Sequence, residues 1–237
     1  MNRLILMVLF AGLFILPYSA QAEEERPILK PSPVSDVFVP QGFDDNDNAE
    51  VVLHGYFPNT CYRIGPTKVF KEEETKTIIV SAQSYYVPGI CLQVMRHYWQ
   101  SVSLGILEKG SYRIKIEQVR STIPTLPVVK SSNSGPDDFL YAPVHEVALA
   151  DTDLHLLTLK GIFKNDCMTL KEVRVVEEPT RVLAVLPIAH YKDNGNCKSA
   201  DIPFTASVEL KPSQEGLYLI HVRSLNGMSF NRVEQLN

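Results

Sequence analysis

Residues 104–116 read LGILEKGSYRIKI, and residues 210–222 read LKPSQEGLYLIHV. Both stretches place a leucine six residues before a glycine, and a tyrosine and an isoleucine two and four residues after it. In the first stretch Tyr112, Ile114 and Ile116 alternate with polar residues. Such alternation is typical of a strand with one buried face. The two stretches therefore predict one half-buried strand in each half of the chain.

The two halves match over a longer range. At a constant offset of 106, residues 45–117 and 151–223 share 18 of 73 positions without a gap. Ordinary residue frequencies would give only about a third as many. The shared residues are glycines, apolar strand positions and all four cysteines. We infer a duplicated domain whose common residues maintain the fold, so that function is sought where the copies differ.

Other segments of the first copy also have strand character. Val51, Leu53, Gly55 and Phe57 fall on one face of an earlier strand, and residues 76–82 carry a β-branched run. Residues 68–70 predict a partner strand joined to that run by a turn containing three glutamates, and residues 102–104 and 36–39 predict two more. No dozen residues show helical spacing with caps. The expected fold is all-β, with two tandem antiparallel β-sandwich domains at residues 34–120 and 139–237.

These motifs resemble known modules. The strand containing Tyr112, and its copy with Tyr218, looks like the late core strand of immunoglobulin-like and fibronectin-type sandwiches, in which a tyrosine fixes a corner. The motif Gly-x-Phe-x-Asn-x-Cys, at 55–61 and 161–167, with a downstream Gly-x-Cys, is similar to small repeated modules of exported bacterial proteins. The resemblance implies Ig-like sandwiches and a non-enzymatic role in the cell envelope. The cysteine spacing departs from the immunoglobulin pattern.

The four cysteines predict two disulfides. Cys61 and Cys91 are 30 positions apart, as are Cys167 and Cys197. Four cysteines allow three pairings, but pairing within each copy gives both copies the same geometry. We therefore expect one internal disulfide per module.

The start of the chain predicts export. Residues 1–22 combine Arg3, an apolar stretch at 4–16 and an Ala-Gln-Ala cleavage pattern, which together are typical of a signal peptide. The expected location is periplasmic or secreted, and an uncleaved signal peptide would be the protein's link to a membrane. Residues 23–33 are expected to form a disordered arm, and residues 121–138, rich in Pro, Ser and Gly, a linker. The net charge of −4 argues against a nucleic-acid partner.

The copies diverge most after their second cysteine. There the first copy has His97, Tyr98 and Trp99, with Tyr85 and Tyr86 across the disulfide loop. These side chains predict an aromatic platform for a sugar or peptide, although Tyr98 and Trp99 are equally consistent with a module core. Leu217 and Leu219 replace polar residues of the first copy, which predicts an apolar face that binds either a partner or the other module.

Acidic residues offer a weak cation-site hypothesis. Asp45 and Asp47 recur as Asp151 and Asp153, and carboxylate-rich loops bind calcium, but the loop lacks the glycine and distal glutamate of an EF-hand. His155 joins the second pair at strand spacing, as in a transition-metal site or an ordinary exposed strand face. The expectation is no metal and no cofactor.

No local enzyme motif is present, neither G-x-S-x-G, H-E-x-x-H, a phosphate loop nor a dinucleotide fingerprint. We expect a non-catalytic protein that binds or organises another envelope component, either a protein or a glycan. One alternative is a secreted peptidase inhibitor that presents residues 83–89 to a protease. Another is a glycan-binding module that uses Tyr98 and Trp99.

Overall fold

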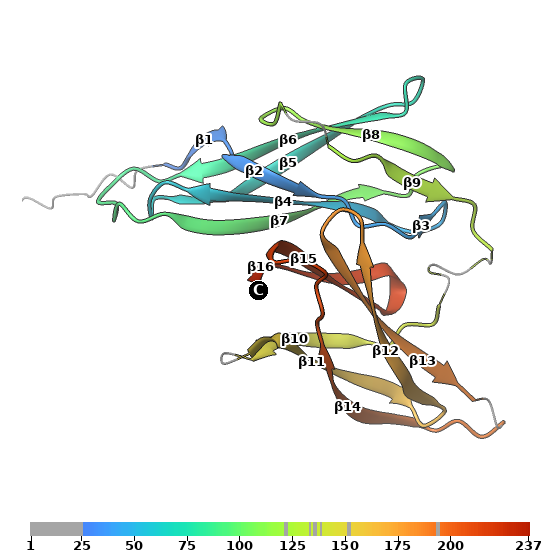
Figure 1. The fold of residues 1–237 in the computed structure, drawn as a ribbon. Helices are drawn as coiled ribbons and strands as arrows, with labels where there is room; N and C mark the ends of the chain where they lie inside the picture. Colours follow the sequence, from blue (N-terminus) through green and yellow to red (C-terminus); the bar gives the residue numbers. More distant parts are fainter. Residues whose placement is uncertain are drawn as a thin grey trace, which may run out of the picture.

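The computed structural model describes residues 26–120, 123–132, 134, 137, 139–150, 153–192 and 195–237. The predicted signal peptide at 1–22 lies outside these residues. Within them the chain forms two β-sandwich modules joined by residues 130–143 (Figure 1). None of their helical segments has the length and hydrophobicity needed to cross a membrane.

Among the described residues, the first module contains nine strands in two layers. One layer has the order β1-β6-β8-β9-β3, with β5 also paired to β6, and the other has the order β2-β4-β7. The strands are β1 (Ile28–Pro31), β2 (Val34–Phe38), β3 (Phe43–Asp44), β4 (Ala49–Phe57), β5 (Tyr62–Glu72), β6 (Thr77–Tyr86), β7 (Arg96–Gly105), β8 (Gly110–Ile116) and β9 (Leu126–Val129).

The alternation of apolar and polar residues in the sequence correctly predicts which side chains form the core of the first module. Tyr112, Ile114 and Ile116 of β8 are buried, as predicted, and pack with Val51 and Leu53 of β4. The hydroxyl of Tyr112 donates to the carbonyl of Glu108 at 2.9 Å, which fixes the turn before β8. The segment that contains residues 68–70 pairs with β6 across the glutamate-rich turn, again as predicted.

The second module repeats this plan. Its layers are β10-β11-β14 and β12-β13-β15-β16. The elements are β10 (Val144–Ala150), β11 (Asp153–Asn165), β12 (Met168–Glu178), β13 (Val182–Tyr191), β14 (Ser199–Glu209), β15 (Gly216–Ser224), the 3-10 turn η1 (Leu225–Gly227) and β16 (Met228–Leu236).

Equivalent hydrogen bonds confirm that the shared residues maintain the architecture. The side chain of Asn59 accepts from the amide of Cys61 at 3.0 Å, and Asn165 accepts from Cys167 at the same distance. The disulfides Cys61–Cys91 and Cys167–Cys197 have Cα separations of 5.4 and 5.5 Å. The predicted pairing is confirmed.

Three details differ from the sequence-based expectation. Residues 28–31, expected in a disordered arm, form β1 and pair with β6, and residues 126–129, expected in the linker, form β9 and pair with β8. Residues 28–31 read ILKP and residues 126–129 read LPVV, so each short segment contains a proline, which is unfavourable inside a sheet, but an open sheet edge supplies partners for the backbone. Most strand pairs are antiparallel, yet β8 pairs with β6 in parallel, as β15 does with β13.

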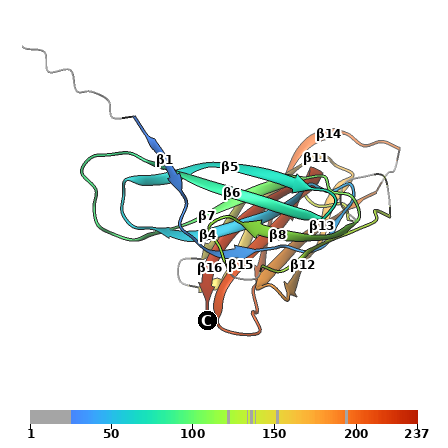
Figure 2. The same cartoon turned by 90° about the horizontal axis from the view of Figure 1, so that it is seen from above.

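The two modules pack through different layers. The three-stranded sheet of the first module lies on the sheet of the second that contains β15 and β16, whose strands run across it (Figures 1 and 2). Their apolar contact consists of Phe38, Val52, Trp99, Val182, Leu217, Leu219 and Val233. Leu217 and Leu219, predicted either for a partner or for the other module, pack against the first module. The partner hypothesis for this face is therefore wrong, because Leu219 is fully buried within the chain.

A polar cluster completes the contact. Arg223 of β15 is buried, and its Nη1 lies 3.0 Å from Oδ1 of Asp137 and 3.6 Å from Oδ2 of Asp47. Its Nη2 donates to the carbonyls of Gln41 and Gly42. One side chain thus ties the second module to a loop of the first and to the connecting segment.

Candidate functional site

A groove lies at one open edge of the first sandwich. Strand β5 pairs only with β6, and β7 only with β4, within the described residues. The groove between them has a volume of about 490 Å³. It is lined by Phe57, Tyr62, Arg63, Ile64, Arg96, His97, Tyr98 and Trp99. Three of the predicted aromatic residues therefore lie together in a cavity.

Stacked rings form part of the groove lining. Phe57 stacks on Tyr98 with ring centroids 4.1 Å apart and planes 7° apart, and on Tyr62 at 5.8 Å. Tyr98 is only 5% exposed, and its hydroxyl donates to the carbonyl of Pro33 at 3.3 Å. Burial raises the pKa of Tyr98 above its ordinary value. Tyr98 therefore supports the groove from within and offers little exposed ring face, as the core alternative expected.

Basic side chains surround these rings. Arg63, Arg96 and His97 are exposed at the groove. Lys30 of β1 lies over the Tyr86 ring at 3.9 Å, and Tyr86 lies 5.1 Å from Tyr62. Residues 51–71 and 75–107, which contain every lining residue, hold no aspartate or glutamate. The groove is therefore aromatic and positively charged.

Trp99 joins the groove to the second module. Its ring lies 5.7 Å from that of His97, and its indole N–H donates to the carbonyl of Asn231 in β16 at 2.8 Å. Asn231 in turn donates to Glu50 of β4 at 2.8 Å and to Ser101 of β7 at 2.9 Å. The second module thus fixes the orientation of one wall of the groove.

The predicted aromatic set is only partly assembled. Tyr85 is 39% exposed and pairs with Leu29 of β1, and it does not line the groove. Tyr86 reaches the groove only through its contact with Tyr62. The sequence pattern did not indicate that Phe57, Tyr62, Arg63, Ile64 and Arg96 would line the groove. Comparison of the copies after their first cysteine would have found part of this set, since Tyr62, Arg63 and Ile64 correspond to Met168, Thr169 and Leu170.

Only the end of the segment 83–89, proposed for a peptidase inhibitor, is a loop. Residues 83–86 belong to β6 and pair with β1, and residues 84–86 also pair with β5. The exposed connection begins at Val87, after the strand ends. A protease cleft could not accept residues 83–86 without removing two neighbouring strands.

The candidate calcium ligands carry structural hydrogen bonds. Oδ1 of Asp45 accepts from the amide of Ser131 at 2.8 Å, which lowers the pKa of Asp45. Asp47 is buried and accepts from the amides of Asp44 and Asp137. These donors compete with a cation for the same oxygen atoms. Asp151 and the side chain of Asp153 lie outside the described residues, among which no metal-binding group of three is found.

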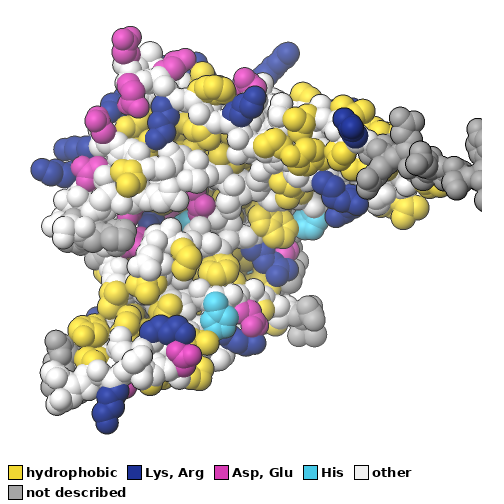
Figure 3. Space-filling model, turned by 180° about the vertical axis from the view of Figure 1, so that it is seen from behind, with side chains coloured by type: hydrophobic (Ala, Val, Ile, Leu, Met, Phe, Trp, Pro, Cys, Tyr) yellow, Lys and Arg dark blue, Asp and Glu magenta, His cyan; other side chains and the backbone are white. Residues whose placement is uncertain are grey.

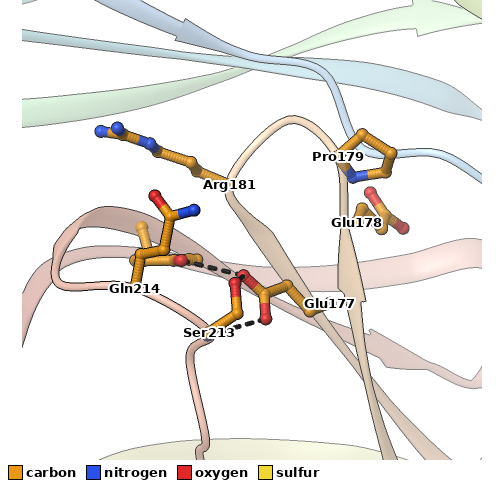
Figure 4. Close-up of a pocket in the computed structure, with 7 residues that line it drawn as sticks. Glu177, Glu178, Pro179, Arg181, Ser213 and Gln214 are labelled. Atoms are coloured by element: carbon orange, nitrogen blue, oxygen red, sulfur yellow. Dashed lines mark hydrogen bonds between the residues drawn. The ribbon is translucent and has the colours of Figure 1, made fainter.

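A second cavity, of about 380 Å³, lies beside the turn between β12 and β13 (Figure 4). Its Glu177 carboxylate accepts from the amide and hydroxyl of Ser213 at 2.9 and 2.8 Å and from the Tyr218 hydroxyl at 2.9 Å. Desolvation raises the pKa of Glu177, but these hydrogen bonds outweigh it and the net shift is downward. Glu177 therefore anchors the turn before β15 in the charged form.

One comparison with known proteins supports the fold of the first module. Residues 51–124 match the family model of the ORF11 beta-sandwich domain. The match covers β4 to β8 and supports a β-sandwich module, but it does not support an assignment to the immunoglobulin-like or fibronectin-type modules of exported bacterial proteins. Neither the curated proteins nor the solved structures include a significant match to the chain.

Proposed function

We propose that the protein is an exported, non-catalytic binding protein of the bacterial cell envelope, and that it holds an extended acidic segment of a partner protein in the groove between β5 and β7. The observation that carries the proposal is the coincidence of two unpaired strand edges with an aromatic, basic cavity. The disulfides are consistent with an oxidising compartment.

The strand edges favour a polypeptide ligand. An exposed edge presents free backbone donors and acceptors, and a partner segment can add to it as a further strand. The backbone of such a segment gains hydrogen bonds from β5 or β7, while alternate side chains enter the groove. A sugar chain offers no such backbone pairing.

The charge of the groove favours acidic partners. Arg63 and Arg96 carry planar guanidinium groups, which can bind carboxylates with two hydrogen bonds, and Nη1 of Arg63 also donates to the carbonyls of Thr60 and Tyr62. The whole chain carries a net charge of −4, so this basic region contrasts with the rest of the protein. Electrostatic steering would then bring acidic segments to this edge.

The second module serves as an internal comparison. At the positions equivalent to Arg63, Arg96, His97 and Trp99 it has Thr169, Ile202, Pro203 and Thr205. The scaffold is the same, but the charges and most of the aromatic surface are absent. The proposed binding role therefore belongs to the first module, while the second orients Trp99.

The experiment uses Trp99 fluorescence of the oxidised chain. We expect an extended peptide of alternating Glu and Val to shift the emission, and the matched Lys and Val peptide to leave it unchanged. The double substitution Arg63→Glu and Arg96→Glu should weaken binding by about tenfold or more, whereas Lys115→Glu on the exposed face of β8 should not. Equal affinity for both peptides, or no effect of the double substitution, would refute the proposal.

The same fluorescence experiment can also support the alternative that the groove binds a glycan. A shift of Trp99 emission with an acidic oligosaccharide, and none with either peptide, would assign the groove to a glycan. A photo-crosslinking residue at His97, with one at the equivalent Pro203 as control, then identifies the partner from the envelope fraction. Crosslinks at both positions alike would show that the groove has no special role.

A further inference from the structure

The connection between β6 and β7 exposes an unusual number of apolar side chains. This tip loop, residues 87–95, reads VPGICLQVM. Ile90 is fully exposed, Met95 is 72% exposed, and Leu92 and Val94 are exposed by half or more. Apolar side chains gathered at a protruding loop, with no cover from the described residues, indicate a surface that binds something apolar.

The backbone of the tip loop is held in place. A disulfide joins Cys91, in the middle of the loop, to Cys61. The amide of Thr60 donates to the carbonyl of Leu92 at 3.1 Å, the amide of Leu92 donates to the Thr60 hydroxyl at 3.0 Å, and the amide of Val87 donates to the carbonyl of Cys61 at 2.9 Å. The loop therefore presents its apolar side chains from a fixed support.

Basic and aromatic side chains lie behind the apolar ones. Arg96 follows the loop directly, Arg63 lies two residues after the disulfide partner, and Lys30 lies on the neighbouring β1. Tyr62 and Tyr86 lie between them, at the start of β5 and the end of β6. In Figure 3 this end of the module, on the right of the view, carries yellow and dark blue side chains, and much of the magenta lies toward the opposite end.

The described chain begins at the same end. Ile28 pairs with Tyr86, the residue before the tip loop, and both Ile28 and Leu29 are about half exposed. The apolar patch therefore continues from the tip loop onto β1. Upstream in the sequence lies the apolar stretch 4–16 of the predicted signal peptide.

We propose that the tip loop inserts its apolar side chains into the interface of a lipid bilayer, with Lys30, Arg63 and Arg96 contacting anionic head groups. The layered order supports a bilayer over a protein partner. Exposed aliphatic side chains occupy the tip loop, and tyrosines and basic residues occupy the adjoining ends of β1, β5, β6 and β7, an order that is typical of membrane interfaces. This site shares Arg63 and Arg96 with the groove, but the apolar residues of the tip loop do not line the groove, so their insertion does not depend on the groove's ligand.

The equivalent connection of the second module has the same support but lacks the apolar side chains. Asp166 and Lys198 repeat the backbone bonds of Thr60 and Leu92. The positions equivalent to Ile90, Leu92 and Met95 are Asn196, Lys198 and Asp201. The scaffold tolerates polar residues there, so the apolar residues of the first module are not required for folding.

Vesicle co-sedimentation tests the proposal. The oxidised chain from Glu23 onward retains every described residue and lacks the apolar stretch of the signal peptide. We expect it to bind vesicles of phosphatidylcholine with about a quarter phosphatidylglycerol, and to bind pure phosphatidylcholine several-fold less. Replacing Ile90→Asn, Leu92→Lys and Met95→Asp together should lower the partition coefficient by at least about tenfold, with no change in net charge.

Two controls separate the proposal from its alternatives. Ile106→Asn removes an apolar side chain that is 64% exposed at the far end of β7, and it should leave vesicle binding unchanged. The triple variant should keep its circular dichroism, its disulfides and its peptide binding in the groove. No sedimentation of the parent chain with either vesicle, or equal sedimentation of the triple variant, would overturn the membrane proposal while leaving the groove proposal intact.

Discussion

Nη1 of Arg223 lies 3.0 Å from Oδ1 of Asp137, and both side chains are buried. Asp137 also accepts from the amide of Gly227 at 3.2 Å, and its own amide donates to Asp47 at 2.8 Å. Burial raises the pKa of Asp137 even though Arg223 opposes the shift. The buried charges of Arg223, Asp47 and Asp137 at the contact between the modules therefore stabilise one another, and loss of one leaves the others buried without a partner.

Replacement of Arg223 tests how much this charge cluster contributes to the stability of the protein. Arg223→Met leaves Asp47 and Asp137 buried without their cation, which should lower the free energy of unfolding by about 3–5 kcal/mol. The measurement is urea unfolding at neutral pH. Arg232→Met is the matched control, since Arg232 pairs with Glu234 at a partly exposed position and should cost less than about 1 kcal/mol. Equal losses in both variants would contradict this account.

Glu178 should make the protein less stable as the pH rises. Burial raises the pKa of Glu178 to about 7, although the amide of Gln41 donates to its carboxylate at 2.8 Å. The folded state therefore binds more protons than the unfolded state between the ordinary pKa of about 4.5 and pH 7, so stability falls as the pH rises through this window. Glu178→Gln keeps an acceptor for Gln41 and should stabilise the protein at pH 8 by on the order of 1–2 kcal/mol, with little effect at pH 5.

The control for this measurement is Glu172→Gln. Glu172 pairs with Arg174 on an exposed part of β12. Its replacement should not stabilise the protein at pH 8. A Glu178→Gln variant that is no more stable than the parent at pH 8 would show that the buried carboxylate carries no penalty.

His221 should have the opposite pH dependence. Its ring is buried, its Nε2 has no hydrogen-bond partner among the described residues, and its Nδ1 lies 2.8 Å from the Asn231 amide oxygen. Burial lowers the pKa of His221 to about 4, and the nearby charge of Arg223 adds to the shift. The unfolded state then binds more protons between pH 4 and the ordinary pKa of about 6.5, so stability is lost as the pH falls through this window.

His221→Asn should remove that loss, because asparagine retains a donor toward Asn231. In the Glu178→Gln background, which cancels the opposing trend, we expect the variant to lose on the order of 2 kcal/mol less than the parent between pH 6.5 and 4. Thermal unfolding at several pH values measures the difference. Parallel stability curves for the two proteins would contradict the assignment to His221.

Much of the fold follows from the sequence because it is encoded locally. The alternation at Tyr112, Ile114 and Ile116 predicts a buried strand face, and the equal spacing of the cysteines predicts both disulfides. The strands β1 and β9 were missed because each is only four residues long and contains a proline, so neither has a strong strand pattern of its own. The edges of β6 and β8 determine them, and those edges exist only after the sheet has formed.

The candidate site was predicted only in part for a similar reason. His97, Tyr98 and Trp99 are consecutive, so the divergence between copies reveals them together. Tyr62 and Arg63 belong to the other layer and approach them only because β5 and β7 meet at an open edge of the sandwich. The module contact was also ambiguous, since an apolar strand face such as that of Leu217 and Leu219 does not specify which surface covers it.

The disulfides should contribute to stability independently. Each closes a loop with a sequence separation of 30 residues. Cys61→Ala with Cys91→Ala, and Cys167→Ala with Cys197→Ala, should each lower the free energy of unfolding by roughly 3 kcal/mol on the chain-entropy model. The quadruple variant should lose about the sum, because the two bonds lie in separate modules. A quadruple loss no larger than either double loss would show that the bonds do not act on separate modules.

Trp99 provides a test of how the modules are coupled. It packs in the apolar contact between them and donates to Asn231 of the second module, so its emission reports docking as well as unfolding. In the parent protein we expect the emission shift and the loss of circular dichroism to coincide during urea unfolding. Arg223→Met should separate them, with Trp99 exposed before the strands are lost, because the polar part of the contact fails first. Coincident transitions in the variant would mean that the apolar contact of Phe38, Val52 and Leu219 suffices to keep the modules docked until both unfold.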